Sequence, residues 1–473
     1  MINAKNNEFL GKEPVGRLLF KLAIPTITAQ IINLLYNIVD RIYISHMEDP
    51  NIEKLGDLAL TGVGVCMPLI MIISAFAALV SSGGAPRASI FMGAGDKESA
   101  ERTMGSCFTL QCIISMILTV VVFIFNRPLL LAFGASPDTI QYASEYMQIY
   151  SIGTIFVQLT LGMNAYITAQ GFSKIGMITV AIGAAVNIVL DPLFIFAFDM
   201  GVRGAALATV ISQGMSCVWV LLFLSGEKSI IKLQKSTLNL DLKLVLPCLA
   251  LGIAPFIMQA SESVVSICFN TSLRTCGNLL SEGGGDMAVR AMTILTSVMQ
   301  FAMLPLQGLA QGAQPIISYN YGAKNKKRVK SAFKILLICS VVYSTAVWAS
   351  VMLFPNLFAQ LFNTKPEDME FTQNALRIYC AALGIFGIQM ACQMTFVALG
   401  KAVSSMSVAI MRKFVLLIPL IYVVPMFFEL GEKTTGIYLA EPIADTISVT
   451  FTAILFAFQF RRTLREIDKI SAE

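Results

Sequence analysis

Long apolar segments recur from one end of this chain to the other, and each is close to the length that crosses a lipid bilayer as a helix. A bilayer core needs about 20 apolar residues in helical conformation. The 473 residues are 56% hydrophobic and only 13% charged, whereas soluble domains carry roughly 25% charged residues. Lipid rather than water must therefore cover most of the surface.

These segments predict an all-α, polytopic membrane protein with twelve transmembrane helices. Backbone groups in lipid must be satisfied within helices or closed barrels, and the segments are too long and continuous for the alternating strands of a barrel. The expected spans are 17–45, 58–82, 103–125, 139–170, 176–198, 204–224, 244–273, 287–317, 329–353, 371–399, 406–428 and 436–460.

The basic residues are distributed unevenly between the two sides of the expected spans. With the N-terminus inside, most of the 34 Lys and Arg residues fall in the even-numbered connections and the two tails, and Arg412 and Lys413 are counted with them. Such asymmetry is typical of a cell-membrane protein with an even number of spans and both termini in the cytoplasm. The net charge of +5 therefore reflects orientation, and we expect no nucleic-acid partner.

The two halves of the chain resemble each other. GAGDK (Gly93–Lys97) matches GAKNK (Gly322–Lys326) at a shift of 229 residues, and the segments that end at Gly171 and Gly400 match at the same shift. The repeat predicts two pseudo-symmetric six-helix lobes, 1–225 and 244–473, joined by a cytoplasmic linker, 226–243. Repeats of this kind place a binding site near the bilayer midplane, between two bundles that rock against each other.

Polar residues form one stripe in the first expected span. Asn33, Asn37 and Asp40 follow Gln30 at helical spacing and share a face. A carboxylate in hydrocarbon costs at least about 2.5 kcal/mol on insertion scales, so such residues usually face a cavity or a partner. Asp40 either forms an internal salt bridge with Arg41 or belongs to a functional site.

The fifth expected span carries Asn187 and Asp191 on one face, followed by Pro192, which disturbs the preceding turn and frees a carbonyl group. Thr209 in the sixth span adds a hydroxyl group. Hard oxygen groups of this kind suit Na⁺ or a held proton. If Asp40 faces Asp191, each carboxylate disfavours ionisation of the other, and exchange between an ion and a substrate cation would couple two fluxes.

The second half has its acids at different positions. Asn270 stands where the repeat places Asp40, and Glu441 stands where it places Thr209. Glu262, in the seventh span, and Glu441 and Asp445, in the twelfth, are candidates for a second cation site or for substrate ligands. The alternative is that they serve packing and helix-end solvation.

The eighth expected span has a stripe of glutamines that includes Gln300 and Gln307. A polar, uncharged wall beside methionines suits a cavity that accepts compounds of varied shape. Methionine is equally common on lipid-facing surfaces, so the sequence leaves open whether this stripe lines a cavity or faces lipid.

The sequence offers little material for enzyme, metal or cofactor chemistry. The single histidine, His46, falls at the membrane edge, and the ten cysteines include no CxxC pair, so we expect reduced packing cysteines. Neither HExxH nor GxSxG occurs, and no nucleophile is paired with a base. We therefore expect no enzyme, no cofactor and no metal beyond Na⁺.

At this point the chain resembles the multidrug and toxic compound extrusion (MATE) family, in particular its bacterial DinF-like branch. The resemblance covers nearly the whole chain. It rests on the two six-helix lobes together with NIVDRIYI around Asp40, NIVLDP around Asn187 and Asp191, and AQGFSKIG after the fourth span.

The resemblance implies export of organic cations or amphiphiles coupled to H⁺ or Na⁺. By motif match, Asp40, Asn187, Asp191 and Thr209 resemble the family's cation-binding cluster in the amino-terminal lobe. Glu262 resembles an acid that another branch uses, but the tenth span reads GIFGIQMACQ and lacks the acid expected with it, which favours the amino-terminal site. Candidate substrate or accessory residues are Asn33, Asn37, Asn164, Glu262, Gln300, Gln307, Glu441 and Asp445.

Two other transport functions stay open on the same scaffold. A flippase of lipid-linked precursors would need interior basic groups for pyrophosphate, and in the sequence these reduce essentially to Arg41. An exporter of a specific peptide or metabolite would have the same architecture. In each case we expect a monomer whose partners are small molecules and the lipid bilayer.

Overall fold

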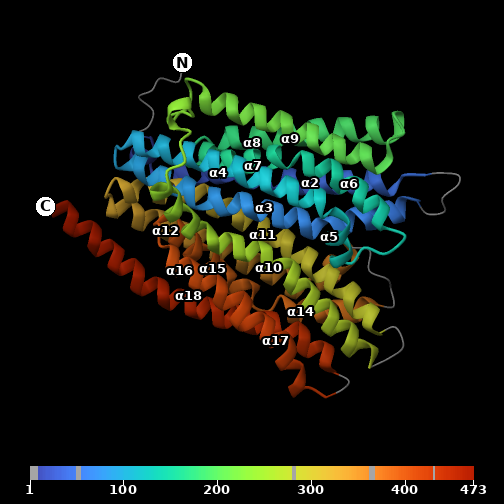
Figure 1. The fold of residues 1–473 in the computed structure, drawn as a ribbon. Coiled ribbons are helices and arrows are strands. Elements are labelled where there is room, and N and C mark those ends of the chain that lie inside the picture. The colour runs from blue at the N-terminus through green and yellow to red at the C-terminus, as the bar shows by residue number, and fades with distance from the viewer. Residues whose placement is uncertain (1–8, 49–54, 280–283, 362–367, 430–431, 473) are drawn as a thin grey trace.

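The structure is a computed structural model that describes residues 9–48, 55–279, 284–361, 368–429 and 432–472. Within these ranges the regular structure is helical throughout (Figure 1). Ten helices are long and apolar enough to cross a membrane, and two further pairs, bent by 57° and 42°, each make one span. The predicted all-α fold with twelve spans is therefore confirmed.

The first half of the chain, α1 to α9, supplies six of these spans. Short helices α1 (Phe9–Lys12) and α5 (Asn126–Ala132) lie beside them. The spans are α2 (Val15–Ser45), α3 (Leu55–Gly93), α4 (Lys97–Ile124), the bent pair α6 (Ile140–Ile152) and α7 (Thr154–Ala169), α8 (Ser173–Pro192) with the π-helical η2 (Leu193–Ala197), and α9 (Gly201–Ser225).

The second half, α10 to α18, supplies the other six after the short η3 (Lys235–Thr237). Helix α13 (Pro355–Leu361) is an additional short element. The spans are α10 (Leu242–Asn278), α11 (Gly284–Gly322), α12 (Lys326–Leu353), the bent pair α14 (Met369–Tyr379) and α15 (Leu383–Ala398), the broken span of α16 (Ala402–Ile410), η5 (Met411–Leu417), α17 (Ile418–Val423) and η6 (Val424–Phe427), and α18 (Lys433–Ala472).

The two halves repeat each other in detail. Helices α3 and α11, and likewise α4 and α12, begin and end at positions that differ by 229 residues. At the N-termini of α4 and α12, the side chains of Asp96 and Asn325 each accept a hydrogen bond from the backbone N–H three residues later, which satisfies one free donor of the helix. The pseudo-symmetry is thus observed, while the lobe boundaries at 225, 226, 243 and 244 stay a prediction.

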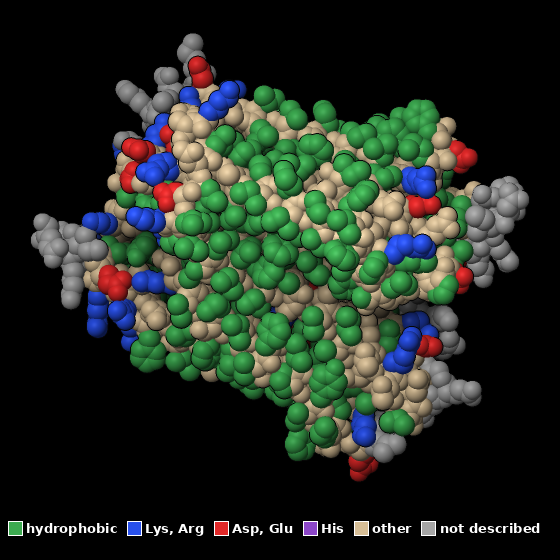
Figure 2. All heavy atoms as spheres, in the orientation of Figure 1, with side chains coloured by type: hydrophobic (Ala, Val, Ile, Leu, Met, Phe, Trp, Pro, Cys, Tyr) green, Lys and Arg blue, Asp and Glu red, His purple; other side chains and the backbone are tan. Residues whose placement is uncertain are grey.

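A broad apolar belt crosses the face of the molecule that Figure 2 shows. Figure 2 shows hydrophobic side chains over the middle of the visible face, with Lys, Arg, Asp and Glu gathered at its two ends. The described chain begins at α1 and finishes at the end of α18 on the same side of this belt (Figure 1). We call this side the terminal end and the other side the open end. The protein is a multi-pass membrane protein.

The two halves touch closely at the terminal end, where glycines let backbones meet. A Cβ atom on Gly252 of α10 would lie 1.7 Å from the carbonyl oxygen of Leu79 in α3, and one on Gly83 would lie 1.9 Å from the carbonyl oxygen of Cys248. Because small residues allow helices to approach in this way, α3 and α10 cross backbone to backbone. The Thr26 hydroxyl, in α2, donates to the carbonyl oxygen of Gly308 in α11 at 2.6 Å.

Toward the open end the halves separate. One apolar cluster there consists only of first-half residues and another only of second-half residues, whereas two clusters nearer the termini mix the two halves. Two contacts still join the halves on the way toward the open end: the ring centroids of Phe76 and Phe256 lie 5.1 Å apart, and the side-chain amide of Gln30 donates to Oε1 of Gln311 at 3.3 Å. We call these two contacts the floor between the halves.

Candidate functional site

The sequence-predicted acids of the first half lie on two adjacent helices. Helix α2 carries Asp40 and packs along α8, which carries Asn187 and Asp191. Pro192 lacks a backbone N–H, and the span continues as the π-helical turn η2. The amide of Asn187 donates to Oδ1 of Asp191 at 3.1 Å, and both side chains are buried.

The carboxyl groups of Asp40 and Asp191 meet within hydrogen-bonding reach of each other. Three buried oxygens at this point have no hydrogen-bond donor among the described residues: Oδ1 of Asp40, Oδ2 of Asp191 and Oδ1 of Asn187. Two adjacent carboxylates cannot both stay ionised unless a cation lies beside them. This group, which we call the first-half acid pair, therefore favours one bound positive charge.

Two tyrosines lie within electrostatic range of the first-half acid pair, and a third stacks on one of them. Tyr36 is influenced by the charges of both carboxyl groups, and Tyr146 is influenced by Asp40 and interacts with the Thr209 side chain. The rings of Tyr146 and Tyr150 stack at 6.1 Å. Sequence reasoning missed these residues, although Tyr146 and Tyr150 share a helical face in the predicted fourth span.

A second charged group lies in the other half. Arg412 donates through Nε to Oδ1 of Asp445 at 2.7 Å and through Nη2 to Oε1 of Glu441 at 3.0 Å. Lys413 donates to Oε1 of Glu262 at 2.7 Å. We call these five residues the second-half ion cluster. Both bases lie in the π-helical η5, and Pro419, which cannot donate to the carbonyl of residue 415, accounts for the irregular turn.

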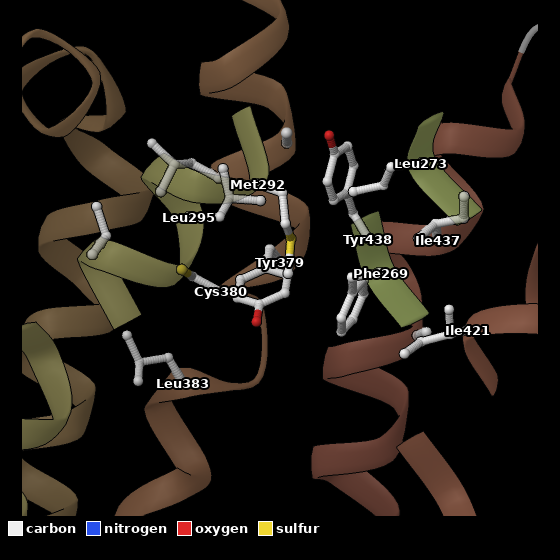
Figure 3. Close-up of a cluster of buried hydrophobic side chains, with 14 of the residues drawn as sticks. Phe269, Leu273, Met292, Leu295, Tyr379, Cys380, Leu383, Ile421, Ile437 and Tyr438 are labelled. Carbon is white, nitrogen blue, oxygen red and sulfur yellow. The ribbon is translucent and has the colours of Figure 1, made fainter. Parts of the chain in front are cut away.

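Apolar packing encloses most of the second-half ion cluster. Leu417, Ala440 and Ala444 belong to the same buried core as the side chains drawn in Figure 3, and the Arg412 guanidinium lies 4.7 Å from the centroid of the Phe386 ring. Charges in such surroundings lose their hydration, so each must be paired with an opposite charge. In the cluster every charged side chain contacts at least one of opposite charge, although the three acids outnumber the two bases.

Comparison with known proteins identifies the family. The MatE family profile matches residues 25–193 and 263–423, which is more than half of the chain. The chain belongs to the MATE family. The multidrug export protein MepA of Staphylococcus haemolyticus (strain JCSC1435) is 24% identical to this MATE protein over 463 residues, covering 98% of this chain and 97% of that one.

Two solved structures share the fold of this MATE protein. One, described as "Crystal structure of MATE in the bent conformation", gives a TM-score of 0.88 at 23% identity and covers 99% of both chains. Another, described as "Outward-facing conformation of a multidrug resistance MATE family transporter of the MOP superfamily", gives 0.85 at 22% identity and covers 98% of this chain and 99% of that one. Family members are transporters, which confirms that the chain is not an enzyme; the DinF-like branch stays a prediction.

The remaining predicted residues of the amino-terminal site lie at different distances from the acid pair of this MATE protein. Thr209 donates to the carbonyl oxygen of Ala205 and is linked to the pair through Tyr146. Asn37 donates to the backbone oxygen of Asn33 on its own helix at 2.6 Å. Asn164 donates to the carbonyl oxygen of Gly176, eleven residues before Asn187, which is about 16 Å along a helix.

The Asp40–Arg41 salt bridge, the ordinary reading of the first-span acid, is not formed among the described residues. Arg41 is exposed and acts on Asp40 only through its charge, whereas the side chain of Asp191 interacts with Asp40 directly. In α11 Gln300 and Gln307 are exposed, and Gln311, on the same stripe, reaches Gln30 of the other half. The glutamine stripe thus runs toward the floor between the halves.

The assignment of Arg412 and Lys413 to a cytoplasmic connection is wrong. Both side chains are buried inside the second half, because Glu262, Glu441 and Asp445 compensate their charges. Interior basic residues are therefore not limited to Arg41, and the argument that set aside a flippase loses that premise. A usable signal was available, since both bases fall within the expected span 406–428 and two acids follow in the next span.

Proposed function

We propose that this MATE protein exports organic, often cationic, compounds across the cell membrane in exchange for H⁺ or Na⁺ by alternating access, working as a monomer and without a cofactor. The observation that carries the proposal is the first-half acid pair. Asp40 and Asp191 approach each other without a basic partner among the described residues and with unpaired oxygens. Such a pair takes up one small cation.

The coupling follows from competition for one charge. A proton shared by the carboxyl groups, or Na⁺ held by the oxygens of Asp40, Asp191 and Asn187, neutralises the pair. Asn187 fits either ion, because its amide N–H groups fix Asp191 while its own oxygen stays available. Loss of that ion restores negative charge, and the two states can favour different arrangements of the halves.

The direction of export rests on orientation. Most basic residues outside the helix cores lie at the terminal end, so we place both termini in the cytoplasm. The halves, which separate at the opposite end, then stand open to the exterior. In this arrangement the acid pair lies beyond the floor, on the side from which an ion of higher external concentration arrives.

The substrate class is supported by the relatives. A protein that matches almost the full chain is named a multidrug export protein, and a structural neighbour is described as a multidrug resistance transporter. A flippase is less suited to the geometry. Arg412 and Lys413 are already bound by three carboxylates, so the second-half ion cluster carries excess negative charge, which repels a pyrophosphate group.

Reconstituted vesicles test the proposal. Purified protein in liposomes is given a pH gradient without Na⁺, and separately an Na⁺ gradient at equal pH, while ethidium, an organic cation, is followed by fluorescence. Wild-type protein should move ethidium under at least one gradient. Asp40→Asn and Asp191→Asn should reduce movement to the level without a gradient.

Asp138→Asn is the matched control, because Asp138 is an exposed acid of the same half. It should transport as the wild type does. Undiminished gradient-driven transport in both Asp40→Asn and Asp191→Asn would remove the first-half acid pair from the mechanism.

A further inference from the structure

The second-half ion cluster has a buried part and an accessible part. In the buried part, the side chains of Arg412, Glu441 and Asp445 are all nearly inaccessible. In the accessible part, the Lys413 side chain is 3% exposed but the Glu262 side chain is 54% exposed. The ammonium group can therefore be approached only past its partner, whereas the carboxylate can be reached directly.

The surroundings of Glu262 indicate where its open side faces. On the outer part of α10, Glu262, Ser266 and Asn270 form an exposed polar stripe, and Val264 and Ile267 form a separate exposed apolar one. Hydrocarbon suits the apolar stripe, and a carboxylate requires water or a partner. The polar stripe thus faces the space between the halves.

The position along α10 agrees with this assignment. Phe256 contributes to the floor between the halves through its contact with Phe76. Glu262 lies six residues farther toward the open end, which is about 9 Å along the helix. A compound that enters between the halves meets Glu262 shortly before it reaches the floor.

The charges of the cluster do not balance. Two basic side chains face three carboxylates, and Arg412 uses its hydrogen bonds on Glu441 and Asp445. Lys413 contacts only Oε1 of Glu262, and no partner of Oε2 is found in the described part of the chain. The excess negative charge therefore lies at the buried part, where Arg412 faces two carboxylates. Glu262 is balanced by Lys413 but keeps one accessible oxygen without a partner beside that ammonium group.

Resting on the proposed export function, we propose that the second oxygen of Glu262 binds the positive group of an organic monocation, and that Lys413 sets the strength and charge selectivity of this contact. Lys413 is the specificity-determining residue here. The fixed positive charge of Lys413 beside the carboxylate weakens binding of the ligand's positive group, which allows the ligand to be released. The same charge repels a second positive group on the ligand. Lys413 thereby favours monocations over dications.

Binding of matched dyes tests this assignment. Ethidium and propidium share one ring system but carry one and two positive charges, and Nile red is uncharged. Their affinities for detergent-purified protein are measured by fluorescence polarisation without any gradient. In Lys413→Met, ethidium should bind about tenfold more tightly and propidium should gain more, because a nearby like charge has been removed; Nile red should be unchanged.

Two control variants isolate the charge. Lys413→Arg keeps the positive charge and should retain the wild-type preference for ethidium over propidium. The double variant Lys413→Met with Glu262→Gln removes both charges, leaves no buried ammonium without a partner, and should bind ethidium more weakly than wild type. Since Glu262 is largely exposed, Lys413→Met is expected to fold.

Several results would overturn the proposal. An equal gain for Nile red would mean that the substitution changed cavity shape rather than charge, and an unchanged ethidium affinity would mean that Lys413 does not act on the ligand. Displacement of ethidium by NaCl but not by choline chloride, persisting in the double variant Asp40→Asn with Asp191→Asn, would assign Glu262 to Na⁺ instead. Because binding is measured without a gradient, these outcomes are independent of whether H⁺ or Na⁺ drives transport.

Discussion

The first half of this MATE protein brings two acids together without a basic partner among its described residues, whereas the second half places two bases among three acids. The repeat aligns the two regions closely, since paired helices begin and end at matching positions. Gly183 of α8 stands at the position that Arg412 occupies in the second half. The same scaffold therefore holds buried acids without a base in one half and with bases of the chain in the other.

The difference indicates that the two halves of one duplicated fold can have different electrostatic roles. In the mechanism that we propose, the acid pair Asp40 and Asp191 binds a mobile cation, so its charge changes when that cation binds and leaves. The second-half ion cluster carries its cations on the chain, so most of its charge is permanent. We infer that the first half responds to the coupling ion and that the second half offers a constant electrostatic surface.

Removal of the Arg412 charge should have the largest effect on stability. Arg412→Met leaves Glu441 and Asp445 buried without their partner, and breaking a buried pair in this way typically costs about 3–5 kcal/mol. We expect a strongly lowered melting temperature in detergent, measured by the loss of monodisperse protein on heating.

The matched control neutralises all three charges in the buried part of the second-half ion cluster. In the triple variant Arg412→Met, Glu441→Gln, Asp445→Asn no charge remains uncompensated, and most of the stability should return. Melting of the single variant close to wild type would mean that the two acids do not depend on Arg412, and the contrast between the halves would lose its basis.

The equivalent change in the first half should act in the opposite direction. Asp191→Asn removes one of two like charges, keeps an oxygen for the amide of Asn187, and adds a donor for Asp40. We expect stability in detergent to be unchanged or raised by about 1 kcal/mol, the value of a typical hydrogen bond, while coupling is lost. A clear loss of stability would show that the acid pair is held by a fixed positive charge after all.

Much of this architecture could be predicted from the sequence because it depends on local patterns. Apolar length gave the twelve spans, and the shift of 229 residues gave the repeat. The acids Asp40 and Asp191 stood out because carboxylates are costly in lipid. Arg412 and Lys413 were misplaced because two basic residues near the start of an apolar segment resemble a flanking loop, and only their tertiary partners show that they lie inside.

Other features could not be predicted since they depend on how distant helices meet. Tyr146 is an ordinary aromatic residue in its own span and becomes part of the site only because α6 packs against α9, which carries Thr209. The separation of the halves at one end likewise depends on close backbone contacts such as Gly252 with Leu79. Periodicity within one helix carries no information about either.

We expect the smallest change in stability from substitutions in the matched turns that precede α4 and α12. Gly95 has φ of +81° and Lys324, at the same position of the repeat, has φ of +56°; side chains disfavour this left-handed conformation by about 1 kcal/mol, whereas glycine adopts it freely. Gly95→Ala should therefore destabilise by about 1 kcal/mol. Lys324→Gly should be neutral or slightly stabilising, since relief of strain is offset by the greater freedom of glycine in the unfolded chain. Melting of both variants in one detergent measures the difference, and equal shifts of the same sign would mean that the two turns do not impose the same backbone requirement.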